Sequence, residues 1–248
     1  SQYSSNNIDR NIIEILSTSN KIYNYFSFNE FKFELDLRLN IINAAILLYK
    51  SGFRFKSFRK SMCNPLYWDR TDEGGFMLKN GTRPSDAVND IYINGSQYGT
   101  ECATAIVIIY YKALLGVYPA DLYNNIFSRI YLMNWQHLDP NLGIVHYRNL
   151  ADYLPGDCRY FKNPDVDPLT TEWQGENTID LGNNMYYGHG IGIGTQERII
   201  SELNKHRITG SNTSAYLMDS ATLPDFKNLA KLYFNYNTQE DIQYMTPA

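Results

Sequence analysis

One long apolar run near the middle of the chain constrains the fold more than any other feature. Residues 100–111 read TECATAIVIIYY, so an acid and a thiol stand directly before an almost unbroken apolar series. The pattern predicts a helix that begins near Glu101 and ends at Gly116, with Gly99 and Thr100 supplying a turn and a capping oxygen. Because apolar residues continue almost all round this helix, we expect it to be buried.

Cys102 falls in the first turn of the predicted helix, which makes it a candidate nucleophile. Unpaired backbone N–H groups and the helix dipole stabilise an anion at this position, and such an environment lowers the pKa of a thiol. The alternative interpretation is a small buried cysteine, which is the commoner fate of a lone cysteine in an apolar run. Position alone leaves both interpretations open.

Composition and charge exclude several classes of protein. Of the 248 residues, 44% are hydrophobic and 19% are charged, which is typical of a globular protein. A formal net charge of −4, without a run rich in Lys and Arg, argues against nucleic-acid partners. The apolar run is shorter than the roughly 18 residues that a membrane span needs, and Lys112 closes it, so we expect no membrane association.

Periodicity along the chain predicts an α+β fold. Helical spacing dominates early and strand-like segments dominate after Ile126, which indicates that the central helix packs on a sheet. We interpret residues 1–248 as a single domain with loose ends over 1–7 and 235–248. The other predicted helices span 8–16, 28–51, 84–93, 195–205 and 224–234, and the main predicted strands span 126–135, 144–148, 158–161, 173–181, 185–193 and 215–217.

A cysteine nucleophile requires a base, and the sequence offers three candidates. Glu176 stands at the start of a predicted strand, and His189 lies between two glycines on the next one, in the Cys-then-His order of papain-like enzymes. Glu101 adjoins Cys102 and supplies a second carboxylate. Each has an ordinary alternative: a surface carboxylate for Glu176, a tight bend or bulge at the glycines around His189, and a dipole partner for Glu101.

Metal and cofactor sites have little support in the sequence. The other two cysteines, Cys63 and Cys158, lack the helix-start context, and three irregularly spaced cysteines give no zinc signature. The glycine-rich stretch 190–194 is a weak match to a dinucleotide-binding loop. The remaining histidines have no metal-ligand spacing and are interpreted as structural or surface residues: His137, His146 and His206. We therefore expect no metal and no cofactor.

Several segments, in chain order, carry a resemblance to a known family. They include ECATAIVIIYY at 101–111, GDC at 156–158, YFKNP at 160–164, and Trp173 followed by GEN at 175–177. The chain resembles the spore-coat protein-glutamine γ-glutamyltransferases of Bacillus and related spore formers from about residue 28 to residue 222. The resemblance implies an α+β core of the NlpC-like, papain-related kind, with the nucleophile helix packed on an antiparallel sheet and extra N-terminal helices.

The resemblance also implies an activity and its site. Such a transglutaminase works without calcium: it acylates Cys102 with the γ-carboxamide of a protein glutamine, releases ammonia, and transfers the acyl group to a protein lysine. Glu176 falls on the catalytic Glu of the family, Glu101 on a second Glu that partly substitutes for it, and His189 on a His near the site. The resemblance further implies that the partners of the enzyme are spore-coat proteins, which the enzyme meets in the coat after its synthesis in the mother-cell cytoplasm.

A crosslink forms only if water is kept from the thioester, and aromatic side chains are suited to this. We expect Trp173, Trp68 and Tyr186 to line the substrate channel. Two alternatives stay open at this point. One is an NlpC-like cysteine peptidase or amidase that acts on cell-wall peptides, with water as the acceptor. The other is a non-catalytic coat or matrix protein, which the 21 tyrosines suggest.

Overall fold

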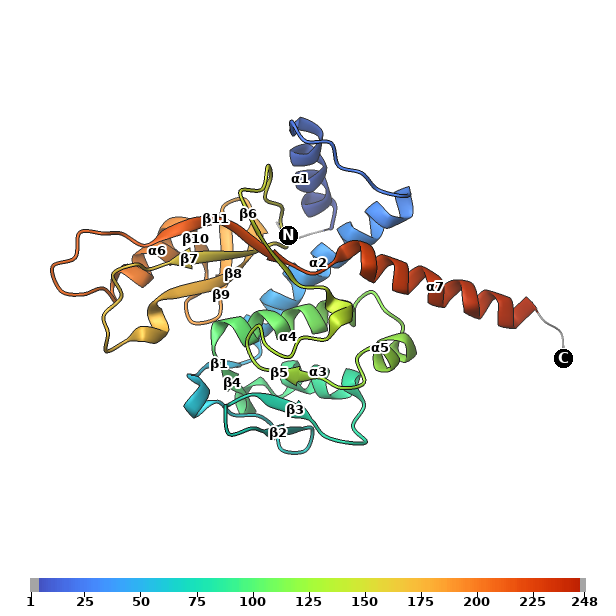
Figure 1. The fold of residues 1–248 in the computed structure, drawn as a ribbon, viewed down its shortest axis with the longest axis horizontal. Helices are drawn as coiled ribbons and strands as arrows, with labels where there is room; N and C mark the ends of the chain where they lie inside the picture. The colour runs from blue at the N-terminus through green and yellow to red at the C-terminus, as the bar shows by residue number, and fades with distance from the viewer. Residues whose placement is uncertain (1–4, 246–248) are drawn as a thin grey trace.

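The apolar run forms α4 (Cys102–Leu114), the helix around which the other elements of this computed structural model are packed (Figure 1). The structure describes residues 5–245, with side chains placed for 7–238. Every residue of α4 except Cys102 and Lys112 is buried, which confirms the predicted burial of this helix. Its N-cap is Glu101 rather than Thr100.

Helices cover one side of α4. The long helix α2 (Phe28–Lys50) begins at the N-cap Ser27, whose side chain accepts a hydrogen bond from the Glu30 amide, and packs along α4. The helices α1 (Ser5–Thr18) and α7 (Phe226–Met245) pack on α2, and Figure 1 shows α7 extending away from the rest of the molecule. Within the described part of the chain, none of the helices is both long and apolar enough to cross a membrane.

A six-stranded antiparallel sheet packs against both α4 and α2. Its strand order is β10-β9-β8-β7-β11-β6, and β8 makes the contact with α4. The helix α6 (Gln196–Asn204) packs on β9, β10 and β11. These strands are β6 (Val145–Arg148), β7 (Cys158–Lys162), β8 (Gly175–Gly182), β9 (Met185–Gly188), β10 (Gly192–Thr195) and β11 (Tyr216–Leu223). The predicted α+β class, with the central helix on an antiparallel sheet, is confirmed.

Short elements complete the fold beside the start of α4. A parallel pair joins β1 (Arg54–Phe55) to β4 (Gly99–Thr100), the strand that leads into α4. A three-stranded sheet contains β2 (Trp68–Arg70), β3 (Phe76–Leu78) and β5 (Tyr131–Leu132). The remaining helices are α3 (Pro84–Ile93) and α5 (Ala120–Ile126), and the 3₁₀ turns are η1 (Phe58–Lys60), η2 (Gly95–Gln97), η3 (Pro140–Leu142) and η4 (Thr171–Trp173).

The structure differs from the sequence prediction in several places. Of the predicted strand 126–135, only Tyr131–Leu132 forms a strand, β5. The predicted single strand 185–193 is a hairpin of β9 and β10, in which Gly188 pairs with Gly192, so His189 lies in the turn. Gly192 has a φ of +93°, which L side chains rarely adopt, and this allows the chain to reverse. Residues 5–7 and 235–245, predicted to be loose, belong to α1 and α7, while 1–4 and 246–248 lie outside the described residues.

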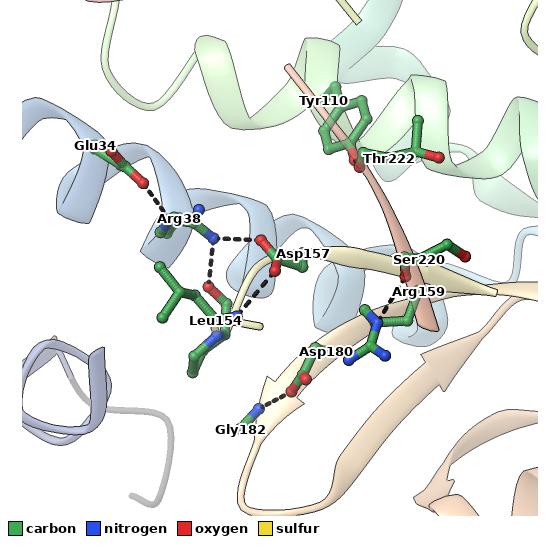
Figure 2. A network of polar contacts seen from close by, with 11 residues as sticks. Glu34, Arg38, Tyr110, Leu154, Asp157, Arg159, Asp180, Gly182, Ser220 and Thr222 are labelled. Atoms are coloured by element: carbon green, nitrogen blue, oxygen red, sulfur yellow. Dashed lines mark hydrogen bonds and ion pairs between the residues drawn. The ribbon is translucent and has the colours of Figure 1, made fainter. Parts of the chain in front are cut away.

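A buried ionic network ties α2 to the sheet (Figure 2). Arg38 is only 3% exposed; its Nε lies 2.8 Å from Glu34 Oε1, and its Nη1 lies 2.7 Å from Asp157 Oδ1. The other oxygen of Asp157 accepts a hydrogen bond from the Leu154 amide. Because each buried charge has a partner, the network fixes where β7 begins relative to α2.

Candidate active site

Cys102 lies at the first position of α4 and lines an open cleft of about 870 Å³. The thiol-bearing residue is partly exposed, so it is not sealed inside the core. Two acids line the same cleft, Glu101 and Glu172. The aromatic part of the wall consists of Phe55, Phe58, Trp135 and Tyr160. The arrangement gives a sulfur atom access to substrate while apolar rings shield its surroundings.

Asn177 is the hydrogen-bond partner of the thiol. Its Nδ2 donates to Cys102 Sγ over 3.4 Å. Asn177 and Tyr160 are paired across β8 and β7, and both line the cleft. Successive side chains of a strand point to opposite faces, so Glu176 leaves the other face of β8. Asn177 is not among the residues predicted from the sequence, although its position directly after Glu176 in the segment 175–177 was an available signal.

The pKa of the Cys102 thiol is raised well above its usual range, chiefly by burial and then by the charges of Glu176 and Glu101. Hydrogen bonds from the backbone and side chain of Asn177 act in the opposite direction. The prediction of a lowered thiol pKa is therefore wrong. The prediction fails because burial and the neighbouring carboxylates disfavour the thiolate more strongly than the helix dipole favours it.

Glu101 neutralises the helix start that the thiol was expected to use. Its Oε2 accepts a hydrogen bond of 2.6 Å from the Ala103 amide, and its Oε1 accepts one of 2.7 Å from the Thr104 amide. A carboxylate at this position satisfies two of the four unpaired amides and faces the positive end of the dipole. These two amides, which were expected to stabilise an anion at Cys102, are consequently occupied by Glu101.

Glu176 is a buried carboxyl group whose pKa lies close to neutral pH. It is 2% exposed, and its Oε1 accepts a hydrogen bond of 3.3 Å from the Gly190 amide. Burial raises its pKa to about 8, although hydrogen bonds from the backbone of Gly190 and His189 lower it. A carboxyl group of this kind is suited to general acid–base work at neutral pH.

His189 joins the hairpin turn to β1. Its Nε2 lies 3.1 Å from the Arg54 carbonyl oxygen, and its Nδ1 lies 3.1 Å from the Tyr187 hydroxyl. Because a carbonyl oxygen only accepts, Nε2 carries the proton and Nδ1 accepts from Tyr187. Burial lowers the pKa of His189 to about 4, so the ring is neutral at pH 7. Both ring nitrogens are engaged away from the thiol, which favours a positioning role over a catalytic one.

Comparison with known proteins identifies the family. The family model described as protein-glutamine gamma-glutamyltransferase matches residues 1–233. The chain belongs to this family. A protein-glutamine gamma-glutamyltransferase of Bacillus cereus (strain B4264) is 44% identical over 234 residues, which cover 94% of this chain and 84% of the relative. The protein of the same name from Bacillus anthracis (strain CDC 684 / NRRL 3495) is 47% identical over 214 residues, which cover 86% and 77%.

A solved structure of this family has the same fold. The transglutaminase from Geobacillus stearothermophilus (without C-terminal extension) superposes with a TM-score of 0.79 at 46% identity, over 84% of this chain and 98% of that chain. The resemblance stated from the sequence motifs is confirmed, and so is the enzyme class, a transglutaminase.

The three aromatic residues expected to line the substrate channel of this transglutaminase lie elsewhere. Trp68 is 1% exposed in the main core, and Tyr186 packs edge-on against Phe161 in a second buried cluster. Trp173 is half-buried, and its ring stacks on His206 with ring centroids 4.0 Å apart. None of the three is among the residues that line the cleft. The sequence shows which residues are aromatic, but strand register and packing decide which of them face the cleft.

Proposed function

We propose that the chain crosslinks proteins through a thioester formed on Cys102. The observation that carries this proposal is a partly exposed thiol, hydrogen-bonded to Asn177 and electrostatically coupled to a buried Glu176 whose pKa is about 8. Acyl transfer needs a nucleophile and a group that takes up and returns a proton near neutral pH. Cys102 lines the cleft, and Glu176 is buried behind it, near enough for its charge to raise the pKa of the thiol.

In the first half-reaction, Cys102 Sγ attacks the γ-carboxamide carbon of a protein glutamine. The thiol proton passes to Glu176, directly or through one water molecule, and then to the leaving nitrogen. The C–N bond breaks, ammonia leaves, and a γ-glutamyl thioester remains on Sγ. Asn177 Nδ2, which donates to Sγ in the resting structure, is placed to donate to the oxygen that becomes negative during the attack.

In the second half-reaction, the amine of a protein lysine attacks the thioester carbon. Glu176 receives a proton from the attacking nitrogen, and Sγ leaves and is reprotonated. The product is an ε-(γ-glutamyl)lysine crosslink, and the enzyme returns to its starting state. Water competes with lysine at this step, and the aromatic wall of the cleft reduces its access.

The charge states of the two groups determine when the reaction starts. At neutral pH the raised pKa values keep both Cys102 and most of the Glu176 population protonated. A base acts only when it has lost its own proton, so ionised Glu176 is the active form. The thiol then loses its proton during the attack rather than beforehand. Glu101 contributes charge to this pair while its oxygens cap α4.

The finer parts of this function follow the family resemblance. We propose that the reaction needs no calcium, because the groups named above account for every proton and bond in it. We also propose that the substrates are spore-coat proteins, which the enzyme meets in the coat after synthesis in the mother-cell cytoplasm. The support is the similarity to proteins from Bacillus, a genus of spore formers. Incorporation of biotinylated amine into extracted coat proteins, with and without EDTA, tests both statements.

One assay tests the proposed reaction against its rivals. Wild-type protein, a glutamine-bearing protein and a fluorescent primary amine are mixed, and ammonia and incorporated label are both measured. We expect equal rates of ammonia release and labelling at saturating amine, and neither with Cys102→Ala. Conversion of glutamine to glutamate without labelling would contradict a crosslinking enzyme, and cleavage of cell-wall peptides would support the hydrolase. Absence of any Cys102-dependent reaction would favour the non-catalytic coat protein.

A further inference from the structure

The wall of the cleft carries negative charge and no fixed positive charge. Among the described residues that line it, Glu101 and Glu172 are acidic, His146 is the one histidine, and none is Lys or Arg. A primary amine such as lysine carries a positive charge at neutral pH, whereas a glutamine side chain is neutral. The negative charge of the cleft is therefore complementary to the positively charged lysine acceptor, whereas it has no net attraction for the neutral glutamine donor.

The two acids differ in what they are free to bind. Both oxygens of Glu101 accept hydrogen bonds from the first turn of α4. Glu172 is exposed on η4, and within the described part of the chain no ion pair or hydrogen bond engages its side chain. Its carboxylate is consequently the acid of the cleft that remains available for a ligand.

The segment that carries Glu172 is held in place. The neighbouring Trp173 stacks on His206 with ring planes 3° apart, and its ring lies 5.9 Å from that of Phe55. Its carbonyl oxygen accepts a hydrogen bond of 3.1 Å from Asn163 Nδ2, a side chain of a residue that is 2% exposed. A carboxylate on an anchored turn loses less conformational entropy on binding than one on a mobile loop.

We propose that Glu172 selects cationic primary amines as acyl acceptors by binding their ammonium group at the cleft wall. The proposal rests on the acyl-transfer function proposed above. The four methylenes of a lysine side chain pack against the aromatic wall formed by Phe55, Phe58, Trp135 and Tyr160, while the carboxylate holds the charged end. The ammonium then gives one proton to bulk water, and the neutral amine attacks the thioester and gives its next proton to Glu176. Glu172 therefore recruits the acceptor, whereas Glu176 takes part in the chemistry.

Physical chemistry sets the size of the effect. Exposed ion pairs are weak, so loss of the Glu172 charge should raise the KM for a cationic amine by no more than about fivefold at low salt. The interaction is screened within about 8 Å at physiological ionic strength, so the difference should shrink as salt is added. Reversal of the charge adds repulsion, and Glu172→Lys should therefore raise the KM further than Glu172→Gln.

The experiment compares two acceptors at fixed donor concentration. Nα-acetyl-lysine methylamide is cationic at pH 7, and hydroxylamine is uncharged; both are used with wild type, Glu172→Gln and Glu172→Lys. Glu14→Gln, which removes an exposed carboxylate from α1, is the control for net charge. We expect the KM for the lysine derivative to rise in Glu172→Gln and to rise further in Glu172→Lys. The KM values for hydroxylamine and for the glutamine donor should not change in either variant.

The possible outcomes separate this inference from the proposed function. Equal KM values for the lysine derivative in wild type and Glu172→Lys overturn the role of Glu172, even though labelling continues. A parallel rise for both acceptors also overturns it, because the effect would not depend on charge. If wild type releases no ammonia from the donor, the proposed function itself fails. A shift from crosslink towards glutamate in Glu172→Lys, with unchanged total ammonia release, supports the selection of acceptor.

Discussion

Gly188 lies directly against Glu176: a Cβ atom on residue 188 would stand 2.9 Å from Glu176 Cγ. The side chain of Glu176 therefore occupies the space that the side chain of any larger residue at position 188 would need. Gly188→Ala should displace Glu176 and lower kcat/KM by about tenfold or more, since small misplacements of reacting groups are costly. Steady-state amine incorporation measures this.

A matched control for this substitution lies on the same hairpin. A Cβ atom on Gly194 would meet the flexible side chain of Arg198, at a position remote from Glu176. Gly194→Ala should therefore keep most of the activity. Equal activity in both alanine variants would show that the space beside Glu176 is not needed.

The rate should rise with pH through the ionisation of Glu176. The protonated acid cannot accept a proton, so kcat/KM should increase about tenfold per pH unit below the pKa of about 8 and level off above it. Glu176→Gln should lose most of the activity at every pH. A profile that is already level at pH 6 would assign the base to another group. Rate measurements from pH 5.5 to 9.5 with a hydroxylamine acceptor, which stays neutral over most of this range, check the midpoint.

Glu176 should also make the fold less stable at high pH. Its folded pKa of about 8 is above its ordinary value of 4.5, so the folded state binds this proton more tightly than the unfolded state does. The resulting contribution is fully present below pH 4.5 and is lost as pH rises to about 8. Glu176→Gln resembles the protonated form and should unfold at a higher temperature than wild type at pH 9, with little difference at pH 5. Thermal unfolding at both pH values, with Glu14→Gln as the control, measures this.

The hydrogen bonds of Asn177 should make the Cys102 thiol more acidic than it would be without them. Its hydrogen bonds lower the pKa of Cys102 against the effects of burial and charge, so Asn177→Ala should raise that pKa and slow alkylation by iodoacetamide at pH 8. Ser57→Ala, which changes an exposed residue of the same cleft, should leave the alkylation rate unchanged. An unaltered rate in Asn177→Ala would show that Asn177 does not set the acidity of the Cys102 thiol.

Arg38 should be needed for stability and not for chemistry. Arg38→Met leaves the buried Asp157 and the partly exposed Glu34 without their cation, and breaking a buried ion pair typically costs about 3–5 kcal/mol of unfolding free energy. Urea denaturation measures the loss. In the double variant with Asp157→Asn, the loss should be smaller than the sum of the two single losses, because the pair is coupled. Additive losses would mean that the ion pair seen in Figure 2 does not act as a unit.

Elements with strong local signals could be predicted from the sequence. The apolar content of 103–111 required burial, and helical spacing predicted a helix over 28–51, which the structure confirms as α2. The family motifs also implied that Cys102 and Glu176 lie close together, and in the structure the charge of Glu176 raises the pKa of Cys102. These features depend on residues close together in the chain or on long motifs.

Other features depend on distances that the sequence does not contain. The raised thiol pKa follows from burial and from a carboxyl group on β8, far along the chain from α4. The turn at His189 depends on the pairing of β9 with β10, which the alternating pattern alone did not separate into two strands. The position of Trp68 in the core likewise follows from its place in a three-stranded sheet. Tertiary packing, rather than local pattern, decided all three.

The capping of α4 by its own neighbouring acid has a consequence for the lifetime of the enzyme. A cysteine reacts with peroxides and disulfides chiefly as its thiolate, which attacks them as a nucleophile, and a capped, buried helix start keeps the thiolate scarce. The enzyme should therefore withstand oxidants longer than cysteine enzymes with acidic thiols do, at the pH values where its thiol stays protonated.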